Sequence, residues 1–95
     1  MKHGWVYMMT NRKGGVLYIG VTSDLASRVY AHKQGAVAGF TQKYRCKRLV
    51  WFEYFENLHD ARRREVQMKE WRRDWKIELI EKANPGWTDL FDQLV

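Results

Sequence analysis

Glu65 is a carboxylate at a helix position where the sequence pattern calls for an apolar side chain. Its predicted helix face is otherwise apolar, with Leu58, Ala61 and Met68 at the inward spacing. An ionised carboxylate on such a face is costly unless a cation accompanies it. Glu65 is therefore expected to form an ion pair with Arg62, Lys69 or Arg28, to extend to solvent, or to bind a free cation.

Arg28 and His32 form a second polar pair, four residues apart in a predicted helix over residues 24–34. Asp24 caps the start of this helix, and Gly35 follows its end. Both polar side chains are expected at the edge of the apolar stripe, where the buried face meets solvent. A guanidinium there can bind phosphate oxygens, and an imidazole with a pKa of about 6.5 can move protons near neutral pH.

Two tyrosines, Tyr7 and Tyr18, lie in a predicted antiparallel hairpin with strands at residues 5–9 and 16–21. A turn rich in Asn and Gly joins the strands. Whether the two phenols share a face depends on the register, which stays open at this point. Gly20 interrupts the second strand, and a residue without a side chain lets another group or a ligand approach the backbone closely.

The rest of the chain is predicted to position these groups. A basic, aromatic loop is expected at residues 35–47, followed by a third strand over 48–55 that is central or well covered, since both of its faces are apolar. Helices are expected at 58–73 and 74–82, and a short terminal helix at 87–94. Four tryptophans are taken as packing residues: Trp51, Trp71, Trp75 and Trp87.

The loop at 35–47 combines Phe40 and Tyr44 with the cations Lys43 and Arg45. Aromatic rings of this kind can stack on unpaired bases while cations follow the phosphates. The alternative is that Phe40 belongs to the core.

Composition limits the function classes. The 95 residues suit one domain, and a net charge of +6 suits a polyanion such as nucleic acid, although a merely cationic protein has the same charge. The lone Cys46 has no internal disulfide partner, and no Cys or His spacing fits zinc. No apolar run is long enough for a membrane span or a signal segment, so a cytoplasmic protein is expected.

In order along the chain, these residues resemble the GIY-YIG nuclease superfamily. Trp5-Val6-Tyr7 stands at its first tripeptide and matches only the tyrosine, whereas Tyr18-Ile19-Gly20 matches the second tripeptide. Further family positions follow at suitable distances: Arg28, His32, Glu65 and Asn84. The resemblance covers nearly the whole chain and is strongest to small single-domain bacterial members.

The resemblance implies an α/β (α+β) fold in which a central three-stranded antiparallel sheet is flanked by helices, with core motifs in residues 4–84. It implies phosphodiester hydrolysis supported by one divalent metal ion, Mg²⁺ or Mn²⁺. Glu65 corresponds to the metal ligand, Arg28 to the catalytic arginine and Asn84 to a late structural or active-site residue. Of the motif tyrosines, Tyr7 is favoured as general base, supported by Tyr18 and His32.

The predicted function is a nuclease acting on DNA with weak sequence specificity, preferring single-stranded or distorted DNA, with RNA as an alternative substrate. Nucleic-acid contacts are expected from Gly20, Lys43, Tyr44, Arg45 and Arg62. The second interpretation is a binding module that does not cut, or that cuts only with a partner protein. The chain departs from better-studied relatives at Val21, where they carry a lysine.

Overall fold

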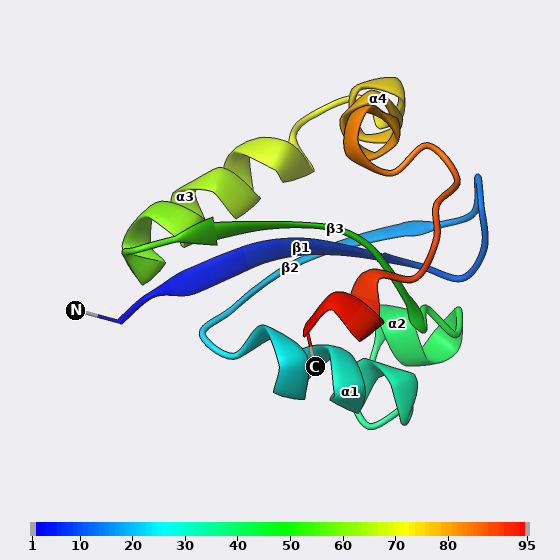
Figure 1. Cartoon of the computed structure of the whole chain (residues 1–95), viewed down its shortest axis with the longest axis horizontal. Coiled ribbons are helices and arrows are strands. Elements are labelled where there is room, and N and C mark those ends of the chain that lie inside the picture. The colour runs from blue at the N-terminus through cyan, green and yellow to red at the C-terminus, as the bar shows by residue number, and fades with distance from the viewer. Residues whose placement is uncertain (1, 95) are drawn as a thin grey trace.

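A computed structural model describes residues 2–94 as a three-stranded antiparallel sheet with helices on both faces, which confirms the predicted fold class (Figure 1). The strands are β1 (Gly4–Thr10), β2 (Leu17–Thr22) and β3 (Arg48–Phe55), in the order β2-β1-β3. Helices α3 (Leu58–Lys69) and α4 (Arg73–Ala83) cover one face. The other face carries α1 (Leu25–Lys33), the single turn α2 (Phe40–Lys43) and the 3₁₀ helix η1 (Leu90–Leu94).

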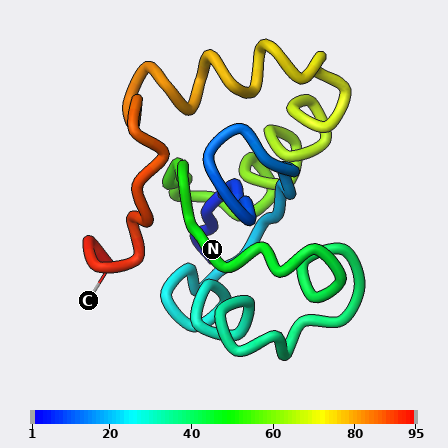
Figure 2. Tube along the Cα trace, turned by 90° about the vertical axis from the view of Figure 1, so that its right-hand side faces the viewer, coloured from blue at the N-terminus to red at the C-terminus, as the bar shows by residue number. Residues whose placement is uncertain are grey.

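Alternation along β1 builds a separate core on each face of the sheet. Val6 and Met8 pack toward α3 and α4, whereas Tyr7 and Met9 pack toward α1. Figure 2, turned by a quarter, shows the strands between these two layers. The central strand is therefore covered on both faces, and Tyr7 in its middle is almost completely buried.

Strand β3 is at the edge of the sheet, so the expectation that it is central is wrong, while the expectation that it is covered is confirmed. Its register against β1 shifts between Met8 and Met9, a β-bulge that leaves Val50 and the following Trp51 both in the α3 and α4 core. Leu49 and Phe52 pack on the opposite face. The apolar residues on both faces of β3 are explained by the helices that cover this strand, and not by a central position in the sheet.

The predicted helices exist, but their limits differ. The helix expected to run to residue 73 ends at Lys69, and the next begins at Arg73. The loop at 35–47 contains α2, and the terminal helix is only the 3₁₀ helix η1. It does not begin at residue 87, because Trp87 has a positive φ of 54°. The caps at Asp24 and Asn57 are confirmed, since each side chain accepts a hydrogen bond from its helix's first turn.

Two aromatic residues for which a place in the packed interior was considered, Trp75 and Phe40, are exposed. Trp75 is 47% exposed, so its prediction as a packing residue is wrong, and with Trp71 it lines a groove of about 400 Å³ along α4. Phe40 is 41% exposed, which excludes its alternative place in the core. None of the helices within residues 2–94 is long and apolar enough to cross a membrane.

The segment after α4 is anchored by Asn84, a buried side chain at the end of that helix. Its Nδ2 donates to the carbonyl oxygens of Val50, at 3.1 Å, and Thr88, at 2.9 Å. Its Oδ1 accepts from the amide and the hydroxyl of Thr88, at 3.1 and 3.0 Å. These contacts are structural: they attach the end of the chain to β3.

Replacing Asn84 with Ala is therefore expected to lower the free energy of unfolding by about 2–3 kcal/mol, because buried backbone groups lose their partners. Urea unfolding measures the change. Gln93→Ala, an exposed amide in the same segment, serves as control and should stay within about 0.5 kcal/mol of the parent. Equal midpoints for Asn84→Ala and the parent protein would contradict this anchoring role.

Candidate active site

The hairpin register places both motif tyrosines on one face of the sheet. Tyr7 on β1 is opposite Gly20 on β2, and Met9 is opposite Tyr18. Directly opposed residues of an antiparallel pair share a face, so both phenols point toward α1. Their ring centroids are 6.2 Å apart. The question that the sequence left open is thus answered by the register.

Gly20 is required by the position of Tyr7. A Cβ atom added at residue 20 would lie 2.6 Å from both Cζ and Oη of Tyr7, closer than such atoms approach in proteins. The group that approaches this backbone is therefore the tyrosine ring itself.

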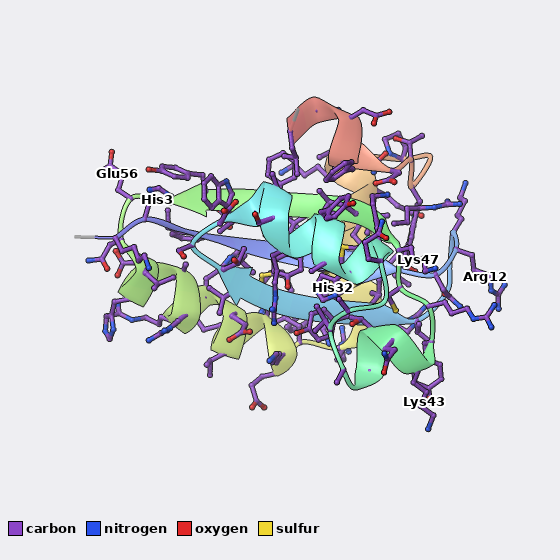
Figure 3. All side chains as sticks on the ribbon, turned by 90° about the horizontal axis from the view of Figure 1, so that it is seen from below. His3, Arg12, His32, Lys43, Lys47 and Glu56 are labelled. Carbon is purple, nitrogen blue, oxygen red and sulfur yellow. The ribbon has the colours of Figure 1, made fainter. Side chains whose placement is uncertain are left out.

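His32 is buried, with 2% of its surface exposed, rather than at the solvent boundary as expected. The reason is its spacing: Leu25, Val29 and His32 all lie on the inward side of α1. Its Nε2 is 2.8 Å from the Tyr7 hydroxyl oxygen, and its Nδ1 is 3.0 Å from Oγ1 of Thr41. Figure 3 shows His32 on α1, close to the segment that carries α2.

Thr41, from α2, is a site residue that the sequence analysis did not single out. It is 3% exposed and bonds to the His32 ring. No local pattern marks a threonine in a cationic loop as buried, because its contact with His32 depends on how α2 folds back against α1.

The site shifts the proton affinities of two of its members. Burial, and then the neighbouring Tyr18, raise the pKa of the Tyr7 phenol, while the adjacent Arg28 guanidinium opposes this change. Burial and the Arg28 charge lower the pKa of His32 to about 4. At neutral pH the imidazole is uncharged, with one nitrogen able to donate a hydrogen bond and the other able to accept one.

Aromatic and cationic side chains at the surface lie next to the hydrogen-bonded Tyr7 and His32. Tyr18 stacks on Phe40, with centroids 6.3 Å apart, and Phe40 contacts Tyr44 at 4.7 Å. We call Tyr18, Phe40 and Tyr44 the aromatic strip. Arg28 and Arg45 are exposed, and Lys43 projects into solvent with its ammonium 5.4 Å from the Tyr44 ring centre (Figure 3).

Glu65 lies on α3, the helix layer across the sheet from α1. Its carboxylate pairs with Lys69 at 3.3 Å, so one of the three predicted ion pairs is present. Within residues 2–94 it makes no hydrogen bond or ion pair with Tyr7, Tyr18, Arg28 or His32. Arg62 is exposed on the same helix, and α3 packs against the edge strand β2 as well as β1.

A metal ion at Glu65 fits the donor set present. Among residues 2–94 there is no group of three or more His, Cys, Asp or Glu side chains that could enclose a metal. Mg²⁺, however, keeps most of its water and binds through one or two carboxylates together with substrate phosphate. The Glu65 side chain is 16% exposed and that of its partner Lys69 is 54% exposed, so the carboxylate can exchange this partner for a cation.

Comparisons with known proteins identify the family of this chain. Residues 3–78 match the family described as the GIY-YIG catalytic domain. The chain is 34% identical over 88 residues to a UPF0213 protein of Pediococcus pentosaceus, covering 93% of each chain. It is 38% identical over 76 residues to a UPF0213 protein of Clostridium perfringens, covering 80% of this chain and 81% of that one.

A solved structure shows the same fold. The solution NMR structure of a UPF0213 protein from Bacillus halodurans superposes with a TM-score of 0.54 and 29% identity, covering 86% of both chains.

The lowered pKa of His32 predicts a loss of stability in acid. The unfolded chain binds a proton at about pH 6.5 and the folded chain only at about pH 4, so stability falls as the pH decreases through this window. At pH 4.5 the loss relative to pH 7 is expected to be about 2–3 kcal/mol from this group. Urea unfolding at both pH values measures it.

In His32→Gln, which cannot take up the proton, the difference between the two pH values should shrink by that amount. His59→Gln removes an exposed histidine on α3 and should leave the difference unchanged. An unaltered difference in His32→Gln would show that the imidazole is not held neutral.

Proposed function

This chain belongs to the GIY-YIG catalytic-domain family, and on that premise we propose that it is a metal-dependent nuclease hydrolysing phosphodiester bonds in DNA. The family is of nuclease type. The observation that carries the proposal is the hydrogen bond between Tyr7 and a neutral His32, with the Arg28 guanidinium beside it. A proton acceptor next to an anion-binding group is the combination that phosphodiester hydrolysis needs.

Arg28 binds the phosphate that is attacked. A guanidinium contacts two phosphate oxygens at once and stays charged throughout, so it stabilises the negative charge that grows as water attacks. Because Arg28 lies beside the Tyr7 hydroxyl, a phosphate held there is next to the buried proton path.

Tyr7 and His32 remove the proton together. Burial raises the pKa of the Tyr7 phenol, so its hydroxyl is protonated at neutral pH and can act as a base only as its own proton leaves. The neutral imidazole takes this proton across 2.8 Å while the phenol oxygen accepts a proton from the attacking water, so no free phenolate forms. Tyr7 remains the favoured base of the sequence analysis, now with His32 as the residue that makes it effective.

Glu65 holds the metal ion, Mg²⁺ or Mn²⁺. When bound, the ion supplies Lewis-acid stabilisation of charge on the phosphate. Val21 stands where better-studied relatives carry a lysine, and its side chain packs on the core under α3. No cation is available from that position, so Arg28 and the metal ion provide the positive charge.

The substrate is DNA with unpaired bases, and specificity for sequence is weak. The aromatic strip extends from Tyr18 in the site to Tyr44 in solvent, which suits stacking of successive unpaired bases. Lys43, Arg45 and Arg62 are exposed and contact phosphates without reading bases.

A binding module is the second candidate. One observation favours it: Glu65 is paired with Lys69 and has no contact with the Tyr7 and His32 network. In that case Arg28 and the aromatic strip hold DNA, and cleavage is absent or needs a partner protein.

Glu65→Gln tests the metal assignment. Cleavage of labelled single-stranded, duplex and branched DNA, with Mg²⁺, Mn²⁺ or EDTA, is expected to fall by about 100-fold or more, because a neutral amide is a weak metal ligand. Binding measured in EDTA should be retained. Glu70→Gln, which changes an exposed carboxylate at the C-terminal end of the same helix, should cleave like the parent protein.

Full Mg²⁺-dependent cleavage by Glu65→Gln would refute the metal assignment. DNA binding by the parent protein without cleavage of any substrate would favour the binding module.

Arg28→Lys tests the phosphate contact while keeping the charge. Loss of bidentate contact is expected to lower kcat by about 10- to 100-fold and to change KM much less. Arg12→Lys, an exposed residue of the hairpin turn, is the matched control. A higher KM at unchanged kcat would reduce Arg28 to a binding contact.

A further inference from the structure

Thr41 bonds to the ring nitrogen of His32 that does not face Tyr7. We propose that Thr41 is a positioning residue, which holds His32 in the tautomer protonated at Nδ1 and thereby keeps Nε2 free to accept the Tyr7 proton. The inference rests on the proposed function, because it concerns the proton path of the same site.

Both ring nitrogens of His32 have a hydrogen-bond partner. Its two nitrogens are 2.8 Å from Tyr7 Oη on β1 and 3.0 Å from Thr41 Oγ1 on α2. Each of the three side chains is at most 3% exposed. Because water does not reach a ring buried in this way, the hydrogen bonds to Tyr7 and Thr41 determine which nitrogen of the neutral imidazole carries the proton.

Two proton arrangements satisfy these distances. In one, the Tyr7 hydroxyl donates to Nε2 and Nδ1–H donates to Thr41. In the other, the Thr41 hydroxyl donates to Nδ1 and Nε2–H donates to Tyr7.

The chemistry of the partners favours the first arrangement. A phenol is a stronger acid than an aliphatic alcohol and hence the better donor to imidazole, while the alcohol oxygen is the better acceptor. Arg28 cannot accept a hydrogen bond, and Nε2 of His32 lies within hydrogen-bond distance of the Tyr7 hydroxyl, so the phenol proton is directed to that nitrogen. The remaining ring neighbour, Tyr18, meets His32 edge-on at 5.4 Å.

The fold of the loop at 35–47 holds Thr41 in place. The Cys46 amide donates to the Thr41 carbonyl oxygen at 2.9 Å, and the Gln42 side chain donates to the Gly35 carbonyl oxygen at 2.8 Å. These bonds close the loop around the short helix α2. The one helical turn that the sequence analysis did not foresee therefore presents a hydroxyl to the end of α1.

The opposite tautomer would disable the path. With a proton on Nε2, the imidazole presents a donor to the Tyr7 oxygen and cannot take the phenol proton. Phosphate binding at Arg28 would be unaffected, so the defect would lie in turnover.

The test compares the parent protein, Thr41→Val and Thr41→Ser. Long-range ¹H–¹⁵N spectra of the histidine rings at pH 7, assigned through His32→Gln, report the tautomer without any need for turnover. The parent protein and Thr41→Ser should show protonated Nδ1 at His32. Thr41→Val, which keeps the shape but lacks the hydroxyl, should lose that preference.

Turnover of single-stranded DNA should follow the spectra. Thr41→Val is expected to lower kcat by about 10- to 100-fold, the range for removing a hydrogen bond that orients a functional imidazole, with KM nearly unchanged. Thr41→Ser should recover most of the rate. Urea unfolding at the assay temperature shows that Thr41→Val remains folded.

Two results would overturn the proposal: protonated Nε2 at His32 in the parent protein, or a Thr41→Val protein that keeps both the parent tautomer and the parent kcat. A parent protein inactive on every DNA would refute the proposed function. The tautomer spectra would still decide whether Thr41 orients the ring.

Discussion

A buried phenol must keep its hydroxyl group hydrogen-bonded, and in this chain that requirement joins the central strand to the helix packed on it. Tyr7 is 1% exposed, and its hydroxyl bonds to His32 across the boundary between β1 and α1. The contact demands a residue without a side chain at position 20, because any Cβ there would collide with the ring. It also demands a partner for the second nitrogen of His32, which Thr41 supplies. One hydrogen bond thus constrains residues from four elements.

The elements themselves could be predicted from local signals. The period-two pattern of the strands, the caps at Asp24 and Asn57 and the glycine after α1 all act within a few residues, so the sequence shows them directly. The pairing of tyrosines, the edge position of β3 and the turn of α2 depend on contacts between distant segments. The spacing of His32 from Leu25 and Val29 already put it on the inward side of α1, so its burial was readable from the sequence, whereas its contact with Thr41 on α2 was not.

The candidate site draws on both layers that cover the sheet. The Tyr7 and His32 network lies under α1, while Glu65 belongs to α3 on the other side. The sequence reduced the partners of Glu65 to three cations, and packing selects Lys69 because it is four residues further along the same helix. Because the sheet separates the two faces, groups from both can act on one phosphate only around its margin; β2 is the edge strand that carries Tyr18 and also packs against α3. The lone carboxylate was visible in the sequence, whereas its separation from the tyrosines was not.

The β-bulge opposite Met8 and Met9 has a consequence for insertions and deletions. Val50 is the extra residue in β3, so removing one residue there would keep Phe52 opposite Tyr7, although the buried Val50 side chain and the carbonyl bound by Asn84 would be lost. Strand β2 has no bulge that could be removed in this way, because its pairing with β1 is continuous from Thr22 to Leu17. Removing one residue between Tyr18 and Thr22 would turn Tyr18 to the α3 side of the sheet. A change of one residue thus preserves the strand register on one edge of the sheet and breaks it on the other, the edge that carries the second tyrosine.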